Sequence, residues 1–143
     1  LKDIIFNNQR FRVQIPGNDH ISNLPWHQDA HYNKIKKTSS IVAWISISDI
    51  EKNMGPLIFK EKSHKIGKMK RINHFRKNGA LTFSVNSKNP KIKKLKEFYT
   101  STKSGDLILI DMFTVHTSGK NLDKNKIKYS AQTRFHVLKN FHI

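Results

Sequence analysis

Apolar and polar side chains alternate with a period of two along several short segments, which is typical of β-strands with one buried face. Turn-forming runs such as Pro16-Gly17 and Asn53-Met54-Gly55-Pro56 separate these segments. We predict extended segments at residues 11–15, 24–32, 41–47, 57–59, 81–85, 107–110 with a continuation over 113–116, and 128–138. In the β-forming segment 41–47, Val42, Trp44 and Ser46 share one face.

One segment has helical spacing instead. Pro90 suits a first helical turn, and apolar residues follow at helical intervals up to Tyr99, so a helix is predicted over 90–99. Short strands between turns, with one helix, indicate an all-β sandwich or barrel with minor helix. The length of 143 residues and the absence of a repeat or linker indicate a single domain, 1–143.

The chain contains no cysteine, which excludes disulfides, thiolate metal sites and iron–sulfur clusters. A metal site must therefore use histidine or one of only 10 acidic residues. The longest aliphatic run, Leu107–Ile110, is far too short to span a bilayer, and the N-terminus lacks the pattern of a secretory signal. We expect a cytoplasmic protein with no membrane partner.

The formal net charge of +17 raises the question of nucleic-acid binding. Most of the cations are lysines rather than arginines, which bind bases and phosphates with two parallel hydrogen bonds, and few aromatic residues lie between them. We favour a solvated basic surface over a nucleic-acid partner. A small-molecule substrate of anionic character is compatible with this charge.

Two histidines and one aspartate have the spacing of a metal site. In an extended segment His27 and Asp29 point to the same side, so both can bind one ion. His116 ends a later predicted strand, 87 positions after Asp29. Two histidines and one carboxylate form the facial triad of non-haem Fe(II) oxygenases, which leaves three adjacent positions open. The alternative is a surface His-x-Asp pair and a buried, structural His116.

Four segments carry motifs in a fixed order. They are 24–32 (LPWHQDAHY), 41–49 (IVAWISISD), 53–67 (containing NMGPL and SHKIG) and 105–121 (containing GDLILI and HTSGKN). These motifs resemble the phytanoyl-CoA dioxygenase family of Fe(II)/2-oxoglutarate-dependent oxygenases, and their order agrees over roughly residues 11 to 138.

The resemblance implies a double-stranded β-helix (jelly roll, cupin-like) that binds Fe(II) through His27, Asp29 and His116 and uses 2-oxoglutarate and O₂. It implies an enzyme, a dioxygenase that converts 2-oxoglutarate to succinate and CO₂ while hydroxylating a small organic substrate. The family normally has an N-terminal helical portion. Because the similarity begins near residue 1, we expect that this portion is missing or that the chain is an unusually short member.

The co-substrate site departs from the family at one position. Aligning 129–135 with the closing strand places Lys128 where the family has an arginine that binds the far carboxylate of 2-oxoglutarate. Ser130 follows two residues later, where the family often has serine. Arg134, on the same strand face, is the alternative anchor, but six residues of strand span about 20 Å, so both cannot contact one carboxylate. We favour Lys128.

Five further residues are candidates for the pocket. Trp44 corresponds to a pocket-lining aromatic beside the co-substrate, with a core tryptophan as the alternative. Ser118 is placed to hydrogen-bond the 2-oxoglutarate carboxylate, with a turn-forming serine as the alternative. His31 is a candidate for a substrate contact and not for a fourth metal ligand. Gln28 and Tyr32 are candidates for the pocket rim.

Three functions are compatible with these features. The leading one is an Fe(II)/2-oxoglutarate-dependent hydroxylase of a small molecule. The second is a nucleic-acid-directed oxygenase or nucleic-acid binder, suggested by the charge. The third is a truncated metal-binding β-domain without turnover, suggested by Lys128 and the missing N-terminal portion. Neither the substrate nor the oligomeric state is indicated by the sequence.

Overall fold

The structure is a computed structural model that describes residues 4–17, 24–32, 40–75 and 79–137. Strands dominate this part of the chain, as predicted. The strands are β1 (Ile4–Gln14), β2 (Ser40–Ser46), β3 (Leu57–Lys60), β4 (Arg71–Phe75), β5 (Leu81–Val85), β6 (Glu97–Tyr99), β7 (Leu107–Asp111), β8 (His116–Ser118) and β9 (Lys128–Val137). The helical turns are η1 (Asp29–His31), η2 (Ser63–Ile66) and α2 (Pro90–Lys93).

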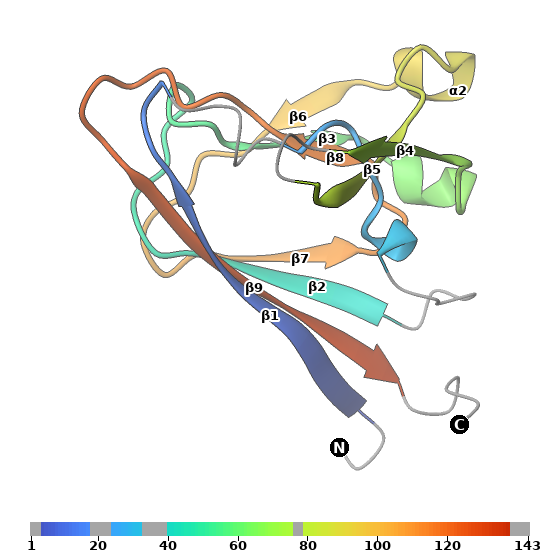
Figure 1. Cartoon of the computed structure of the whole chain (residues 1–143), viewed down its shortest axis with the longest axis horizontal. Helices are drawn as coiled ribbons and strands as arrows, with labels where there is room; N and C mark the ends of the chain where they lie inside the picture. The colour runs from blue at the N-terminus through green and yellow to red at the C-terminus, as the bar shows by residue number, and fades with distance from the viewer. Residues whose placement is uncertain (1–3, 18–23, 33–39, 76–78, 138–143) are drawn as a thin grey trace.

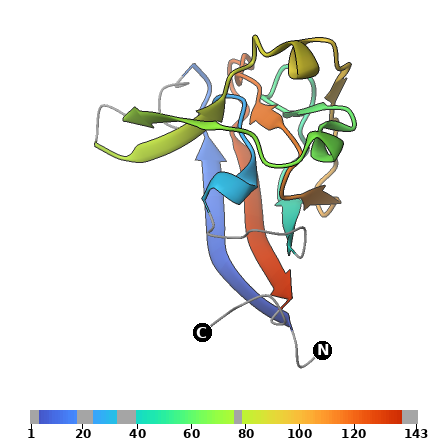
Figure 2. The same cartoon turned by 90° about the vertical axis from the view of Figure 1, so that its right-hand side faces the viewer.

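The strands form two facing layers (Figure 1). One layer is a four-stranded sheet in the order β1-β9-β2-β7, in which every neighbouring pair is antiparallel. The other layer contains the antiparallel sheet β6-β3-β8 and the hairpin β4-β5, which projects to one side in Figure 2. Most neighbours in both sheets are far apart in the sequence, so the fold depends on long-range pairing.

The core lies between the two layers. In β2 the predicted alternation holds: Val42 and Trp44 are 1% and 3% exposed, whereas Ile45 is 39% exposed. The buried side chains of Val42 and Trp44, together with Ile110 of β7, pack against apolar residues of the opposite layer, which include Met54 and Leu57. The four-stranded sheet is therefore buried on one face only, which fits the period of two.

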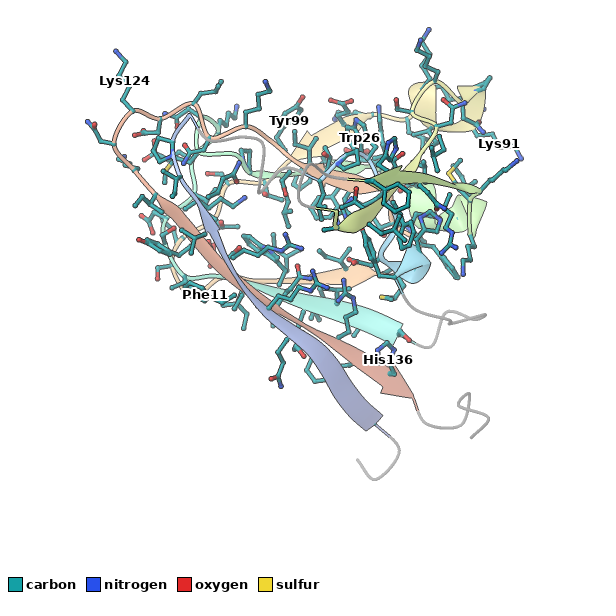
Figure 3. The ribbon with its side chains drawn as sticks, viewed as in Figure 1. Phe11, Trp26, Lys91, Tyr99, Lys124 and His136 are labelled. Atoms are coloured by element: carbon teal, nitrogen blue, oxygen red, sulfur yellow. The ribbon has the colours of Figure 1, made fainter. Side chains whose placement is uncertain are left out.

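The outer face of the four-stranded sheet carries large apolar side chains. Phe11 is 63% exposed and lies on the side of β1 away from the second layer (Figure 3). Leu109 of β7 is 59% exposed. The residues that alternate with Phe11 along β1 are Arg10 and Arg12, and both line the cavity between the layers. The polar face of β1 therefore points inward, which is the reverse of an ordinary half-buried strand and indicates a ligand site.

The predicted helix over 90–99 is wrong in its second half. Asn89 caps the first turn by accepting a hydrogen bond from the Lys91 amide, but α2 ends at Lys93 and the chain continues as β6. Tyr99 pairs with Ile58 of β3 and is 49% exposed. The helical spacing of the apolar residues therefore did not mark a buried face, because pairing with the β3 edge outweighs local preference.

Two of the predicted extended segments also need correction. Within 24–32 the chain forms only an isolated bridge at His27 and then the 3-10 turn η1. The predicted continuation over 113–116 is interrupted, because the amide of Thr114 donates to the Asp111 carbonyl at 2.9 Å and turns the chain. β8 then joins the opposite layer. Strand β4 was not predicted, and residue 138 lies outside the described residues.

The described part of the chain has no helix that is both long enough and apolar enough to cross a membrane.

Candidate functional site

His27, Asp29 and His116 lie together in the space between the layers. His27 and His116 form a two-residue antiparallel bridge, in which each amide donates to the other's carbonyl at 2.9 and 3.0 Å. The turn η1 begins directly after Gln28 and places the Asp29 carboxylate beside both rings. The three potential ligand atoms lie within 4.8 Å of one another, and all three residues are buried. A single ion can therefore contact all three.

Both histidine rings are oriented by the backbone. Nδ1 of His27 lies 2.8 Å from the Pro25 carbonyl oxygen, and Nδ1 of His116 lies 2.9 Å from the Thr114 carbonyl oxygen. A carbonyl accepts only, so each Nδ1 carries the proton, and each Nε2 keeps its lone pair. Nε2 of His116 lies 3.5 Å from the Asp29 carboxylate. A hydrogen bond from Nδ1 to a backbone carbonyl is usual for histidines that bind a metal through Nε2.

The electrostatics of the group favour the protonation states that bind metals. Burial, reinforced by the proximity of His116, lowers the pKa of His27 to about 3, so its ring is neutral. Burial raises the pKa of Asp29, but His116 and Arg134 outweigh this effect, and the pKa falls to about 2. A neutral imidazole and an ionised carboxylate are the forms in which these side chains coordinate a cation.

Arg134 extends from β9 to Asp29. Its Nη2 atom forms an ion pair and hydrogen bond with one Asp29 oxygen, and the side chain is 3% exposed. Its Nε and Nη1 atoms are buried and have no hydrogen-bond partner in the described part of the chain. Arg134 thus compensates the charge of a proposed metal ligand and still has two donors available.

We expect Arg134→Gln to destabilise the metal-free protein by about 3 kcal/mol, because removal of one partner leaves the other charge of a buried pair uncompensated. Bound metal compensates Asp29 as well, so the loss should be smaller in the presence of Zn(II). Urea denaturation with and without Zn(II) measures the difference. An equal loss under both conditions would show that Asp29 is not a metal ligand.

A cavity of about 230 Å³ adjoins the three-residue group. Lys128 lies in its wall, is 4% exposed and donates a hydrogen bond from its ammonium group to the Gly55 carbonyl. The same ammonium lies 6.0 Å from the centre of the Trp44 ring. Burial, with a smaller contribution from Arg12, lowers the pKa of Lys128 to about 8. Ser118 and Ser130 line the same cavity.

The polar face of β9 forms one side of this cavity. Its lining residues are Lys128, Ser130, Gln132 and Arg134, as their shared strand parity predicts. The neighbouring strand β1 adds Arg10, Arg12 and Gln14, which the sequence reasoning missed. The alternation around Phe11 places these three residues on one face of the strand. The pattern alone did not show whether that face points into the protein.

Of the other candidate residues, some line the cavity, and others only support the surrounding backbone, here called the framework. Trp44 belongs to the apolar core and also lines the cavity, so its position is compatible with both suggested roles. Tyr32 lines the cavity, and its hydroxyl accepts a hydrogen bond from the Phe83 amide. Gln28 is fully buried, and its partners among the described residues are all backbone groups, which places it in the framework rather than at a rim.

His31 is also part of the framework. Its Nε2 lies 2.9 Å from the Met69 carbonyl oxygen, and the residue does not line the cavity. His31 instead lines a second hollow with Tyr32, Met69 and Phe83, so a substrate contact by His31 stays a prediction.

Several solved structures with the same fold are about twice as long as this chain. EvdO2 from Micromonospora carbonacea var. aurantiaca matches with a TM-score of 0.74 and 15% identity, over 95% of this chain and 53% of EvdO2. The non-haem monooxygenase ThoJ, in its apo form, matches with a TM-score of 0.72 and 14% identity, over 94% of this chain and 47% of ThoJ.

The epimerase SnoN, solved with Fe³⁺, α-ketoglutarate and nogalamycin RO, matches with a TM-score of 0.75 and 15% identity, over 94% of this chain and 50% of SnoN. The chain thus spans about half the length of each of these three structures. At this identity the likeness establishes the fold, which is the jelly roll implied by the sequence motifs.

No curated protein sequence gives a significant match to the chain. The profile of the phytanoyl-CoA dioxygenase (PhyH) family, however, matches residues 5–126, which is most of the chain. This range contains all three residues of the candidate metal group. The sequence profile and the fold therefore agree, and the chain belongs to the phytanoyl-CoA dioxygenase family of Fe(II)/2-oxoglutarate-dependent oxygenases.

Proposed function

We propose that this protein is an Fe(II)/2-oxoglutarate-dependent dioxygenase that hydroxylates a small organic substrate and binds one Fe(II) through His27, Asp29 and His116. The observation that carries this proposal is the buried group of two histidines and one carboxylate, with ligand atoms within 4.8 Å, beside a cavity. Two nitrogen donors and one oxygen donor suit Fe(II) and leave positions for other ligands. Iron, 2-oxoglutarate and O₂ together supply the oxidising chemistry.

The residues of the chain hold and orient these partners. The carbonyls of Pro25 and Thr114 fix both histidine rings with Nε2 available for the metal. The low pKa of Asp29 keeps its carboxylate ionised at every physiological pH. Both rings are in place before a metal binds, and one oxygen of the Asp29 carboxylate contacts Arg134.

We assign the far carboxylate of 2-oxoglutarate to Lys128, with Ser118, Ser130 and Trp44 lining the same part of the cavity. Lys128 is a buried cation whose described partners are the Gly55 carbonyl and the face of Trp44. Arg134, the alternative anchor, is paired with Asp29 at the metal group, which favours Lys128. An ammonium group binds a carboxylate as a point charge, without the two parallel hydrogen bonds of guanidinium.

The proposal is tested with protein purified without oxygen. Addition of 2-oxoglutarate to the Fe(II) protein should produce a metal-to-ligand charge-transfer band in the visible range, and exposure to O₂ should yield succinate. Absence of the band, together with no succinate for any member of a substrate panel, would reject the proposal. Metal binding without a band would instead support a β-domain that has lost co-substrate binding.

The affinity for 2-oxoglutarate should depend on pH through Lys128. The pKa of about 8 means that Lys128 is charged below pH 8 and neutral above it. A bound carboxylate favours the ammonium form, so the pKa of Lys128 in the complex lies above its value in the free protein. The affinity should therefore fall above about pH 8, by up to about tenfold per pH unit.

Titration of the charge-transfer band between about pH 7 and pH 9.5 measures this dependence. Lys128→Arg is the control, because guanidinium stays charged over this range. A parallel decline in both proteins would assign the pH effect to a group other than Lys128.

A further inference from the structure

Cationic side chains outnumber acidic ones in the cavity wall. The described lining includes Arg12, Lys128 and Arg134, with Arg10 alongside, and a single carboxylate, that of Asp29. On the function proposed above, the two positive charges of Fe(II) are balanced by the two negative charges of 2-oxoglutarate. The excess of positive charge therefore persists in the loaded site, and a further anion would be attracted to it.

Arg12 lies between the two ends of this cavity. It pairs with Ser130 in the β1–β9 register, one inward-facing position along from the Gln14–Lys128 pair. Its guanidinium is close enough to Asp29 and Arg134 for both charges to affect the pKa of Arg12. Arg12 in turn lowers the pKa of Lys128. Arg12 is therefore near the metal group as well as the co-substrate end.

Hydrogen-bond donors at this position lack acceptors. Arg12 is half-buried and forms no hydrogen bond or ion pair with the described residues. Arg134 is 3% exposed and has two buried nitrogens, Nε and Nη1, without a partner in the described part of the chain. Buried donors are rarely left unpaired, so the two Arg134 nitrogens indicate a missing partner, and the neighbouring Arg12 guanidinium lines the same cavity. A carboxylate or phosphate group offers acceptors that match a guanidinium.

The remaining cavity wall limits the size of the ligand. On the side of strand β5 the cavity is lined by Leu81, Thr82 and the ring of Tyr32. A volume of about 230 Å³ is smaller than the pockets of drug-sized ligands, and the co-substrate occupies part of it. A compact molecule fits these dimensions.

We propose that the substrate of this oxygenase is a compact small molecule that carries a carboxylate or phosphate group, and that Arg12 binds this group. Arg12 is then a residue that determines substrate specificity, distinct from the co-substrate anchor Lys128. This inference rests on the proposed function, because it assigns a substrate class to the same site.

The test uses Fe(II) protein saturated with 2-oxoglutarate under nitrogen, so that binding is measured without turnover. Calorimetry follows titration with three matched pairs: hexanoate and hexanamide, benzoate and benzamide, and glycerol 3-phosphate and glycerol. The charge-transfer band is recorded at each point and shows whether the co-substrate stays bound. At least one anionic probe should bind about tenfold or more tightly than its neutral partner.

The variant Arg12→Gln should abolish this preference and should change the affinity for 2-oxoglutarate by much less than it changes the preference, and Arg12→Lys should retain part of the preference. Arg71→Gln is a matched control, because Arg71 lies over the Phe83 ring and outside the cavity lining. The inference is overturned if no anionic probe binds at millimolar concentration, or if the preference survives in Arg12→Gln. It is also overturned if Arg12→Gln weakens 2-oxoglutarate binding instead, since Arg12 would then belong to the co-substrate site.

The two proposals fail separately. A missing charge-transfer band contradicts the proposed function, whereas a normal band with equal binding of acids and amides contradicts only the substrate class.

Discussion

His27→Ala is expected to lower the affinity for Fe(II) by more than a hundredfold and to abolish 2-oxoglutarate-dependent succinate formation. Mutation of groups that only orient metal ligands typically costs about 10- to 100-fold in affinity, so loss of a ligand itself should cost more. Only two proposed ligands, Asp29 and His116, would remain. Anaerobic equilibrium dialysis with Fe(II) measures the affinity, and far-ultraviolet circular dichroism verifies the fold.

The matched control is His31→Ala. His31 lies four residues further along the chain, is buried to a similar degree as His27, and contacts the Met69 carbonyl rather than the metal group. This variant should lose some stability but bind Fe(II) with nearly the wild-type affinity. Equal loss of iron in both variants would mean that His27 acts through the fold, and the assignment of the metal ligands would be wrong.

Lys128→Met is expected to weaken 2-oxoglutarate binding by about 10- to 100-fold, the range that corresponds to one charge-assisted hydrogen bond. Methionine retains most of the length and apolar contact of the lysine stem, so the change removes mainly the ammonium group. Fe(II) affinity should be unchanged, because Lys128 is not among the proposed ligands. Lys128→Arg should restore tight binding, since guanidinium binds a carboxylate with two parallel hydrogen bonds.

Lys60→Met is the control for removing a buried lysine. Lys60 is 8% exposed, pairs with Glu97 at 2.9 Å and lies over the Trp26 ring, outside the cavity lining. Its loss should not change the affinity for 2-oxoglutarate. If Lys128→Met binds 2-oxoglutarate normally while Arg134→Gln does not, the far carboxylate belongs to Arg134, and the assignment of the anchor must be reversed.

Local sequence information located the strands better than the segments that carry the ligands. The alternation in 41–47 and 128–138 predicted β2 and β9 because strands with one buried face repeat every two residues. The segment 24–32 was predicted as extended, yet Asp29 begins a 3-10 turn. His27 and Asp29 nevertheless lie close together, as predicted, because the backbone bridge between His27 and His116 positions the turn.

Pairing between distant segments explains the errors. The residues of β6 resemble the end of a helix in isolation, and they become a strand because β3 offers an open edge. The turn at Asp111 and Thr114 moves β8 to the opposite layer, which a continuous apolar pattern does not reveal. Such contacts depend on residues far away in the chain, so a local window contains no information about them.

The sequence by itself determined the all-β class, the absence of thiolate chemistry, the identity of the three candidate metal ligands and the unusual lysine at position 128. The first two follow from residue type and periodicity, and the last two follow from the resemblance of the ordered motifs to the family; none of them needs coordinates. The tertiary structure decided which face of β1 and β9 points inward, and with it the cationic wall of the cavity and the pairing of Arg134 with Asp29. A period of two separates the faces of a strand, but only packing against the second layer determines which face is buried.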